Sequence, residues 1–253
     1  MSTTRMRSTN SPITLALIAL MASVLGSQTS VAAEAKAPAE GVATFAGLQS
    51  LHLKKEDVTL FYDPQLSQVL TTPHPRQAEM QAQGIFIARP LSTQLLGKGK
   101  GFFTVECDSG PSWDPSCSFY QERDGKPQLV AQIPGLRFAL PGDGSIYVEG
   151  HNDTMFNQRE KYTWQNGRFI AVKQAFHYVG LRSTTRHAVD IYATQDAQQI
   201  VAKLAKNTRV EVLLNDGEYY LLKTPFGLLG WLRIATGTSQ EESPLIGVFF
   251  AGD

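Results

Sequence analysis

The sequence predicts an all-β protein in which an N-terminal antiparallel β-domain precedes a small barrel. Short apolar runs recur along the chain, and turn-forming residues separate most of them. Hydrophobic residues make up 42% of the chain, which is enough for a folded core. The 253 residues exceed the usual size of one domain and allow two.

The N-terminal domain is expected to span residues 45–182. Its sharpest signal is the Asn166-Gly167 pair between two apolar runs, because both residues tolerate the positive φ of a tight hairpin turn. The one helix candidate in this domain is short and covers 76–83. The strands expected from apolar runs and their flanking turns are 58–62, 84–88, 102–106, 118–122, 128–132, 146–149, 161–164 and 168–174.

Residues 1–33 have the pattern of a secretory signal peptide. Arg5 and Arg7 supply the positive charge that precedes the apolar run 13–26. Small residues at 31–33 offer a cleavage site, and the apolar run is short for a membrane span, which needs about 20 residues. We therefore expect a periplasmic or secreted protein whose mature form has no membrane span. The alternative is an uncleaved anchor.

The charge of the mature chain argues against a nucleic-acid partner. Removing residues 1–33 takes away two arginines and no acidic residue, which leaves 21 basic against 23 acidic side chains and a net charge of −2. Binding to a phosphate backbone requires a basic surface, and no cluster of four Lys or Arg occurs. The first mature residues, 34–44, are small and Ala-rich, as in a flexible linker.

Cys107 and Cys117 are the only cysteines in the chain. A close, even pair in an exported protein is most simply a disulfide, and the turn-rich residues between them suit a bridge across a loop. The alternative is a catalytic thiol with a spare partner. No nearby histidine motif supports that alternative.

Residues 186–236 alternate short apolar runs with turn signals, at Asn215-Asp216-Gly217 and at Pro225-Phe226-Gly227. The order of the runs is VDIY, then AKLAKNTRVEVL, then EYYLLK, and finally GLLGW. This order resembles the bacterial SH3-like (SH3b) family, which implies a small SH3-like barrel with a binding role. The family usually has Trp where this chain has Tyr219. The N-terminal domain resembles uncharacterised exported β-domains that carry such tails, which implies no function.

The candidate ligand-binding residues are aromatic side chains of the expected barrel. Aromatic residues on one face of a small binding barrel can form a groove for an extended peptide. They can equally fill the core of so small a domain. Strand alternation places Tyr219 and Tyr220 on opposite faces, so one of them is expected in the core. The candidates are Tyr192, Tyr219, Tyr220, Phe226 and Trp231.

Catalytic and metal-binding motifs are not evident in the sequence. The five histidines are scattered, and no HExxH, GxSxG or phosphate-binding loop occurs. His151 and Asp153 are the best metal candidates, but two ligands without a third make a poor site. We therefore expect no enzyme activity, no metal and no cofactor.

The sequence favours an exported binding module of the cell envelope that recognises a peptide, a peptidoglycan fragment or a protein partner. One alternative is a periplasmic inhibitor or immunity protein against a cell-wall-active enzyme. Another is an enzyme with a non-standard site around His151, Asp153 and His177. The tail 237–253 ends in an apolar run, which we expect to add a strand or to dock on the folded body.

Overall fold

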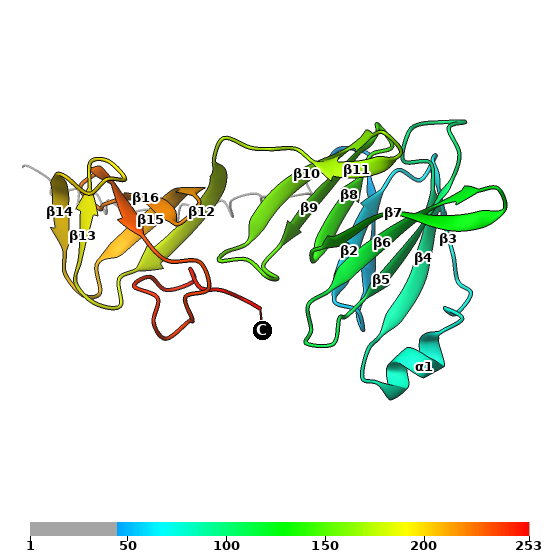
Figure 1. Ribbon diagram of the computed structural model, residues 1–253, viewed down its shortest axis with the longest axis horizontal. Coiled ribbons are helices and arrows are strands. Elements are labelled where there is room, and N and C mark those ends of the chain that lie inside the picture. Colours follow the sequence, from blue (N-terminus) through cyan, green and yellow to red (C-terminus); the bar gives the residue numbers. More distant parts are fainter. Residues whose placement is uncertain (1–44, 253) are drawn as a thin grey trace, which may run out of the picture. The chain divides into compact units, whose positions relative to one another are not determined.

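The computed structural model describes residues 45–252. The expected signal peptide, 1–33, and the expected linker, 34–44, lie outside the described residues. Within 45–252 the chain forms three β-sheets and one short helix, which confirms the mostly-β prediction (Figure 1).

The first sheet joins strands from two separate stretches of the chain. Its pairs are antiparallel except for β2 and β8, which run parallel. Asn166 and Gly167 link β10 to β11 with φ values of 50° and 85°, so the predicted tight hairpin is confirmed. In spatial order the strands are β1 (Gln49–Leu53), β2 (Val58–Tyr62), β8 (Arg137–Leu140), β9 (Ser145–Gly150), β10 (Gln158–Gln165) and β11 (Arg168–Ala171).

The second sheet is an antiparallel meander in chain order. The helix α1 (Gln77–Ala82) follows β3 and lies at one end of this sheet in Figure 1, so the expected helix at 76–83 is confirmed. The strand expected at 84–88 begins only at Ile87, because Gly84 ends the helix with a φ of +80°. The strands are β3 (Ser67–Val69), β4 (Ile87–Thr93), β5 (Phe103–Asp108), β6 (Ser116–Arg123) and β7 (Lys126–Pro134).

The first two sheets share one hydrophobic core, as in a β-sandwich. Strand alternation sorts the side chains: Phe103 and Val105 point into the core, whereas Thr104, Glu106 and Asp108 lie on the other face of β5. The fully buried core side chains include Val58, Leu60, Leu91, Phe103, Val105, Phe119, Phe138, Leu140 and Ile146.

The predicted disulfide is present within this core. Cys107 in β5 lies directly opposite Cys117 in β6, with their Cα atoms 4.1 Å apart. Both side chains are fully buried among the apolar residues of the sandwich. The bridge therefore joins the two strands of the β5–β6 hairpin inside the core. The turn between these strands contributes no residue to that core.

The third sheet contains six antiparallel strands from the C-terminal part of the chain. Its edges are β12 and β14, and no pairing among residues 45–252 joins these edges, so the closed barrel expected from the sequence is not formed. The strand β12 falls partly in the range assigned to the N-terminal domain, yet it pairs with β15. In spatial order the strands are β12 (His177–Thr184), β15 (Arg209–Asp216), β16 (Tyr219–Lys223), β17 (Leu229–Arg233), β13 (Val189–Tyr192) and β14 (Ile200–Leu204).

The third sheet packs around a second core that takes residues from two further segments. Met155 and Phe156 precede β10, and Leu245 and Val248 follow β17 by more than ten residues; all four belong to this core. The apolar end of the chain therefore docks, as the sequence predicts, although it forms only isolated bridges, such as Thr154 with Ala251, and no strand.

Candidate functional site

Three of the five predicted aromatic residues line one cleft on the outer face of the third sheet. Tyr192 in β13 pairs with Trp231 in β17, and Trp231 pairs with Leu221 in β16. Tyr219 precedes Leu221 by two residues and therefore lies on the same face. These three aromatic side chains are half-buried and border a cleft of about 280 Å³. This arrangement we call the aromatic cleft.

Polar side chains surround the aromatic cleft. Gln195, Asp196 and Arg233 complete its wall. Arg233 donates from Nε and Nη2 to one carboxylate oxygen of Glu218, at 2.9 and 2.6 Å, and this contact lowers the pKa of Glu218. Gln195 donates to Asp216 at 2.8 Å. These contacts join the polar wall to the neighbouring residues Glu218 and Asp216.

The other two predicted aromatic residues lie elsewhere. Tyr220 points into the second core, where its ring meets Phe156 edge to face at 6.1 Å. It is 1% exposed and does not line the aromatic cleft. Alternation in β16 gives Tyr219 the outer face and Tyr220 the inner one. Phe226 is highly exposed, but it lies in the turn before β17 and does not line the aromatic cleft.

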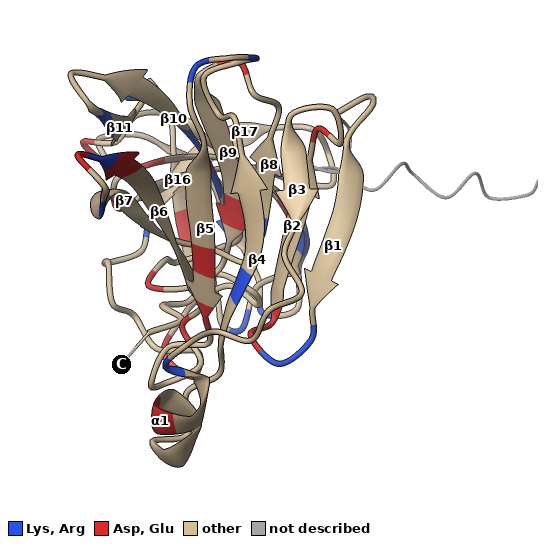
Figure 2. Ribbon diagram, turned by 90° about the vertical axis from the view of Figure 1, so that its right-hand side faces the viewer, with Lys and Arg blue, Asp and Glu red and all other residues tan. Residues whose placement is uncertain are grey.

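A second, larger cleft lies on the outer face of the second sheet, and no motif in the sequence indicates it. Its volume is about 700 Å³, and its polar residues come mainly from β4, β5 and β6. Figure 2 shows acidic positions on β5 beside a basic position on β4. The loop before α1 closes one end of the cleft. The lining includes His74, Arg76, Arg89, Glu106, Asp108, Tyr120, Glu122 and Gln132.

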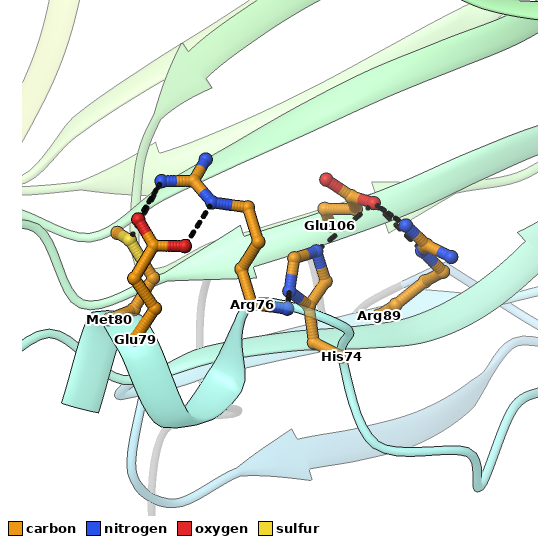
Figure 3. Close-up of polar contacts among 6 residues, drawn as sticks. All are labelled: His74, Arg76, Glu79, Met80, Arg89 and Glu106. Carbon is orange, nitrogen blue, oxygen red and sulfur yellow. Dashed lines mark hydrogen bonds and ion pairs between the residues drawn. The ribbon is translucent and has the colours of Figure 1, made fainter. Parts of the chain in front are cut away.

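Glu106 is the centre of a hydrogen-bonded network in this second cleft (Figure 3). Its Oε1 accepts Nε and Nη2 of Arg89 at 2.7 and 2.6 Å, and it lies 3.3 Å from Nε2 of His74. The backbone N–H of Arg76 donates to Nδ1 of His74 at 3.1 Å, so the imidazole proton is on Nε2, the nitrogen that faces Glu106. The backbone thus fixes the tautomer of a buried histidine.

The second cleft presents both acidic and basic side chains to a ligand. Arg89 and His74 both contact Glu106 through Oε1, which leaves Oε2 of Glu106 for other contacts. Burial raises the pKa of Asp108, although Gly110 and Ser116 oppose this with hydrogen bonds. Burial also raises the pKa of Tyr120, with a smaller contribution from the charge of Glu106. Such a surface suits polar ligands.

The residues of the alternative enzyme site are each engaged in local structure. His151 contacts the carbonyl oxygen of Phe249 through Nε2 at 2.9 Å. Asp153 has a φ of 53°, as expected for a turn residue. His177 hydrogen-bonds to the Gln158 side chain at 3.2 Å. Within residues 45–252 no group of three or more His, Cys, Asp or Glu side chains is arranged to hold a metal ion.

Comparisons with known proteins give no relative from which to transfer a function. No protein-family model matches the chain, and searches of curated proteins and of solved structures also found no match. In the part of the chain that the structure describes, no helix has the length and apolar character needed to cross a bilayer.

Proposed function

We propose that this chain is an exported, non-catalytic binding protein of the cell envelope, and that its third sheet is an SH3-like module. The four sequence runs that carry the resemblance coincide with strands β13 to β17. In this sheet β15, β16 and β17 form a meander, and β17 pairs with β13. This strand order supports the SH3-like assignment, with β12 as an additional edge strand.

The observation that carries the proposal is the convergence of Tyr192, Tyr219 and Trp231 on one cleft. These residues come from three different strands, and the pairing of β13, β16 and β17 brings them together. Half-buried aromatic rings offer a large apolar surface whose orientation is already fixed, which favours binding of extended peptide segments. Asp196 and Arg233 add one charge of each sign for recognition of polar groups on such a segment.

The cell envelope is the location that best fits these features. The resemblance implies wall-associated binding, and the buried disulfide between Cys107 and Cys117 is consistent with an oxidising compartment. Among the partners expected from the sequence, we therefore place a peptidoglycan peptide first. A peptide segment of a protein partner, as in an inhibitor of a wall-active enzyme, uses the same type of cleft.

Sedimentation with purified peptidoglycan tests this proposal. The protein is used as residues 34–253, because Pro38–Asp253 form one compact unit that contains both hydrophobic cores. We expect Tyr219→Ala and Trp231→Ala each to weaken retention by about tenfold or more, as for a central aromatic contact. The matched control is Phe176→Ala, because Phe176 is exposed and lies outside the aromatic cleft.

Two outcomes would count against the proposal. The first is that Tyr219→Ala and Trp231→Ala sediment with peptidoglycan as fully as Phe176→Ala does, which would place the site outside the aromatic cleft. The second is no retention by the wild-type chain on peptidoglycan or on its soluble peptides. Thermal unfolding of each variant shows whether a loss of binding reflects a loss of fold, since Trp231 is half-buried.

A further inference from the structure

The turn between β16 and β17 exposes an unusual concentration of apolar side chains. Phe226 is 89% exposed, the highest value among the large hydrophobic residues in the described part of the chain. Leu228 and Leu229 are 41% and 49% exposed. We call these three residues the apolar tip. Scattered exposed hydrophobic residues are normal, but a contiguous set needs an explanation.

Hydrogen bonds hold the apolar tip in one conformation. The backbone N–H of Thr224 donates to the carbonyl oxygen of Leu228 at 2.9 Å, and the N–H of Gly227 donates back to the carbonyl oxygen of Thr224 at 2.9 Å. The hydroxyl of the buried Thr224 accepts the N–H of Leu228 at 3.0 Å. Gly227 supplies the φ of +95° that this turn requires. The exposed ring of Phe226 is therefore presented by a built turn.

A basic cleft of about 530 Å³ adjoins the apolar tip at Pro225. Arg182, Glu211 and Lys223 lie opposite one another across β12, β15 and β16, and Lys223 in turn lies opposite Leu229. Directly opposed residues share one face of a sheet, so basic and apolar side chains form a continuous surface. Arg209 also lines the cleft.

The charge of this surface is positive. Lys223 pairs with Glu211 at 3.3 Å, whereas Arg182 and Arg209 form no ion pair within residues 45–252. Three cations face one carboxylate in the cleft. The sequence has no acidic residue from position 219 to position 240, a stretch that includes the whole tip.

We propose that the apolar tip and the basic cleft together bind the surface of an anionic lipid bilayer. Phe226, Leu228 and Leu229 enter the boundary between headgroups and acyl chains, and Arg182 and Arg209 lie over lipid phosphates. Shallow apolar insertion beside basic residues is the general physical basis of peripheral membrane binding. The protein is then held at the membrane surface.

The size of the apolar tip favours a lipid surface over a protein partner. A stable protein interface buries about 800 Å² on each partner, with an apolar centre and a polar rim. Three neighbouring side chains at a turn provide only a small part of such an area. Insertion into lipid does not need a complementary surface, and each buried apolar group contributes independently.

Vesicle sedimentation of the chain 34–253 tests the proposal, with equal parts of phosphatidylglycerol and phosphatidylcholine compared with phosphatidylcholine alone. We expect binding to the anionic vesicles that falls at least about tenfold in Phe226→Ser. Arg182→Gln and Arg209→Gln each reduce binding by about fivefold. Trp113→Ser is the matched control, because Trp113 is 64% exposed and lies in the turn between β5 and β6.

A label at the tip gives a direct readout. The only two cysteines form the disulfide, so Phe226→Cys accepts a single polarity-sensitive fluorophore. Its emission shifts to the blue on anionic vesicles, whereas the same label at Trp113→Cys does not shift. Equal binding to both vesicle types, or full binding by Phe226→Ser, overturns the proposal. So does self-association of the wild-type chain that requires Phe226 and occurs without lipid, which identifies a second copy as the occupant.

Discussion

Replacing both cysteines tests how much the buried disulfide stabilises the sandwich core. Cys107 and Cys117 are ten residues apart in sequence, and the bridge closes this short loop in the unfolded chain. The chain-entropy relation gives about 2.7 kcal/mol at 25 °C for such a loop. Both sulfur atoms also lie in the core, and each Cys→Ala change loses about 1 kcal/mol of packing. The double variant should therefore lose about 4–5 kcal/mol of unfolding free energy.

The assay is urea unfolding followed by the fluorescence of Trp164, which packs against Phe103 and Phe169 at centroid distances of 5.4 and 5.0 Å. Replacing Trp113 and Trp231 by Phe in every sample leaves Trp164 as the one reporter, since the chain has three tryptophans. The midpoint should fall by about 2 M urea for the double variant. Cys107→Ala alone should already lose most of this stability. If the double variant loses less than about 1 kcal/mol of unfolding free energy, neither the loop entropy nor the packing of the cysteines stabilises the core as argued.

Three further predictions concern pH and close packing. Because burial raises the pKa of Asp108, the folded state binds the carboxyl proton more tightly than the unfolded state does. The unfolding free energy should therefore fall as pH rises above about 4. Asp108→Asn should flatten this pH dependence in urea unfolding at several pH values. Burial likewise raises the pKa of Tyr220, so stability should fall above about pH 10, and Tyr220→Phe should remove that part of the alkaline loss seen by circular dichroism. In Gly230→Ala the new Cβ would lie 2.8 Å from Cδ1 and 2.9 Å from Cγ1 of Ile191, which should cost about 1–3 kcal/mol. Ile191→Ala removes both of these atoms and should recover part of that cost in a double-mutant cycle, and simple additivity would contradict the contact.

Local patterns in the sequence predicted the parts of the fold that depend on neighbouring residues. The Asn166-Gly167 hairpin and the Cys107–Cys117 bridge each rest on a short stretch of chain, and both are present. The strand β2 was expected at its observed bounds for the same reason. The parallel partner of β2, the strand β8, was missed, because nothing near Arg137–Leu140 indicates a pairing with residues almost eighty positions earlier.

The two clefts differ in how far the sequence could indicate them. Alternation in Tyr219–Lys223 required one tyrosine to face outward, but only the packing of Phe156 against Tyr220 decides which one. The Glu106 network joins residues from a loop and two strands, so no motif of fixed spacing describes it. In β5 the polar residues Thr104, Glu106 and Asp108 alternate with core residues. This alternation predicts a polar outer face, but it does not predict which residues contact that face.

The second core has a consequence for the order in which this chain folds. Strands β13 to β17 lie close together in sequence and can pair early through short connections. Met155 and Leu245, however, are about ninety positions apart, and both are needed to cover that sheet. We expect their docking to be the slow final step, because closing so long a loop costs entropy before any contact forms. Until then Val212 and Leu222 remain partly uncovered, and the nascent protein is most prone to aggregate during that interval.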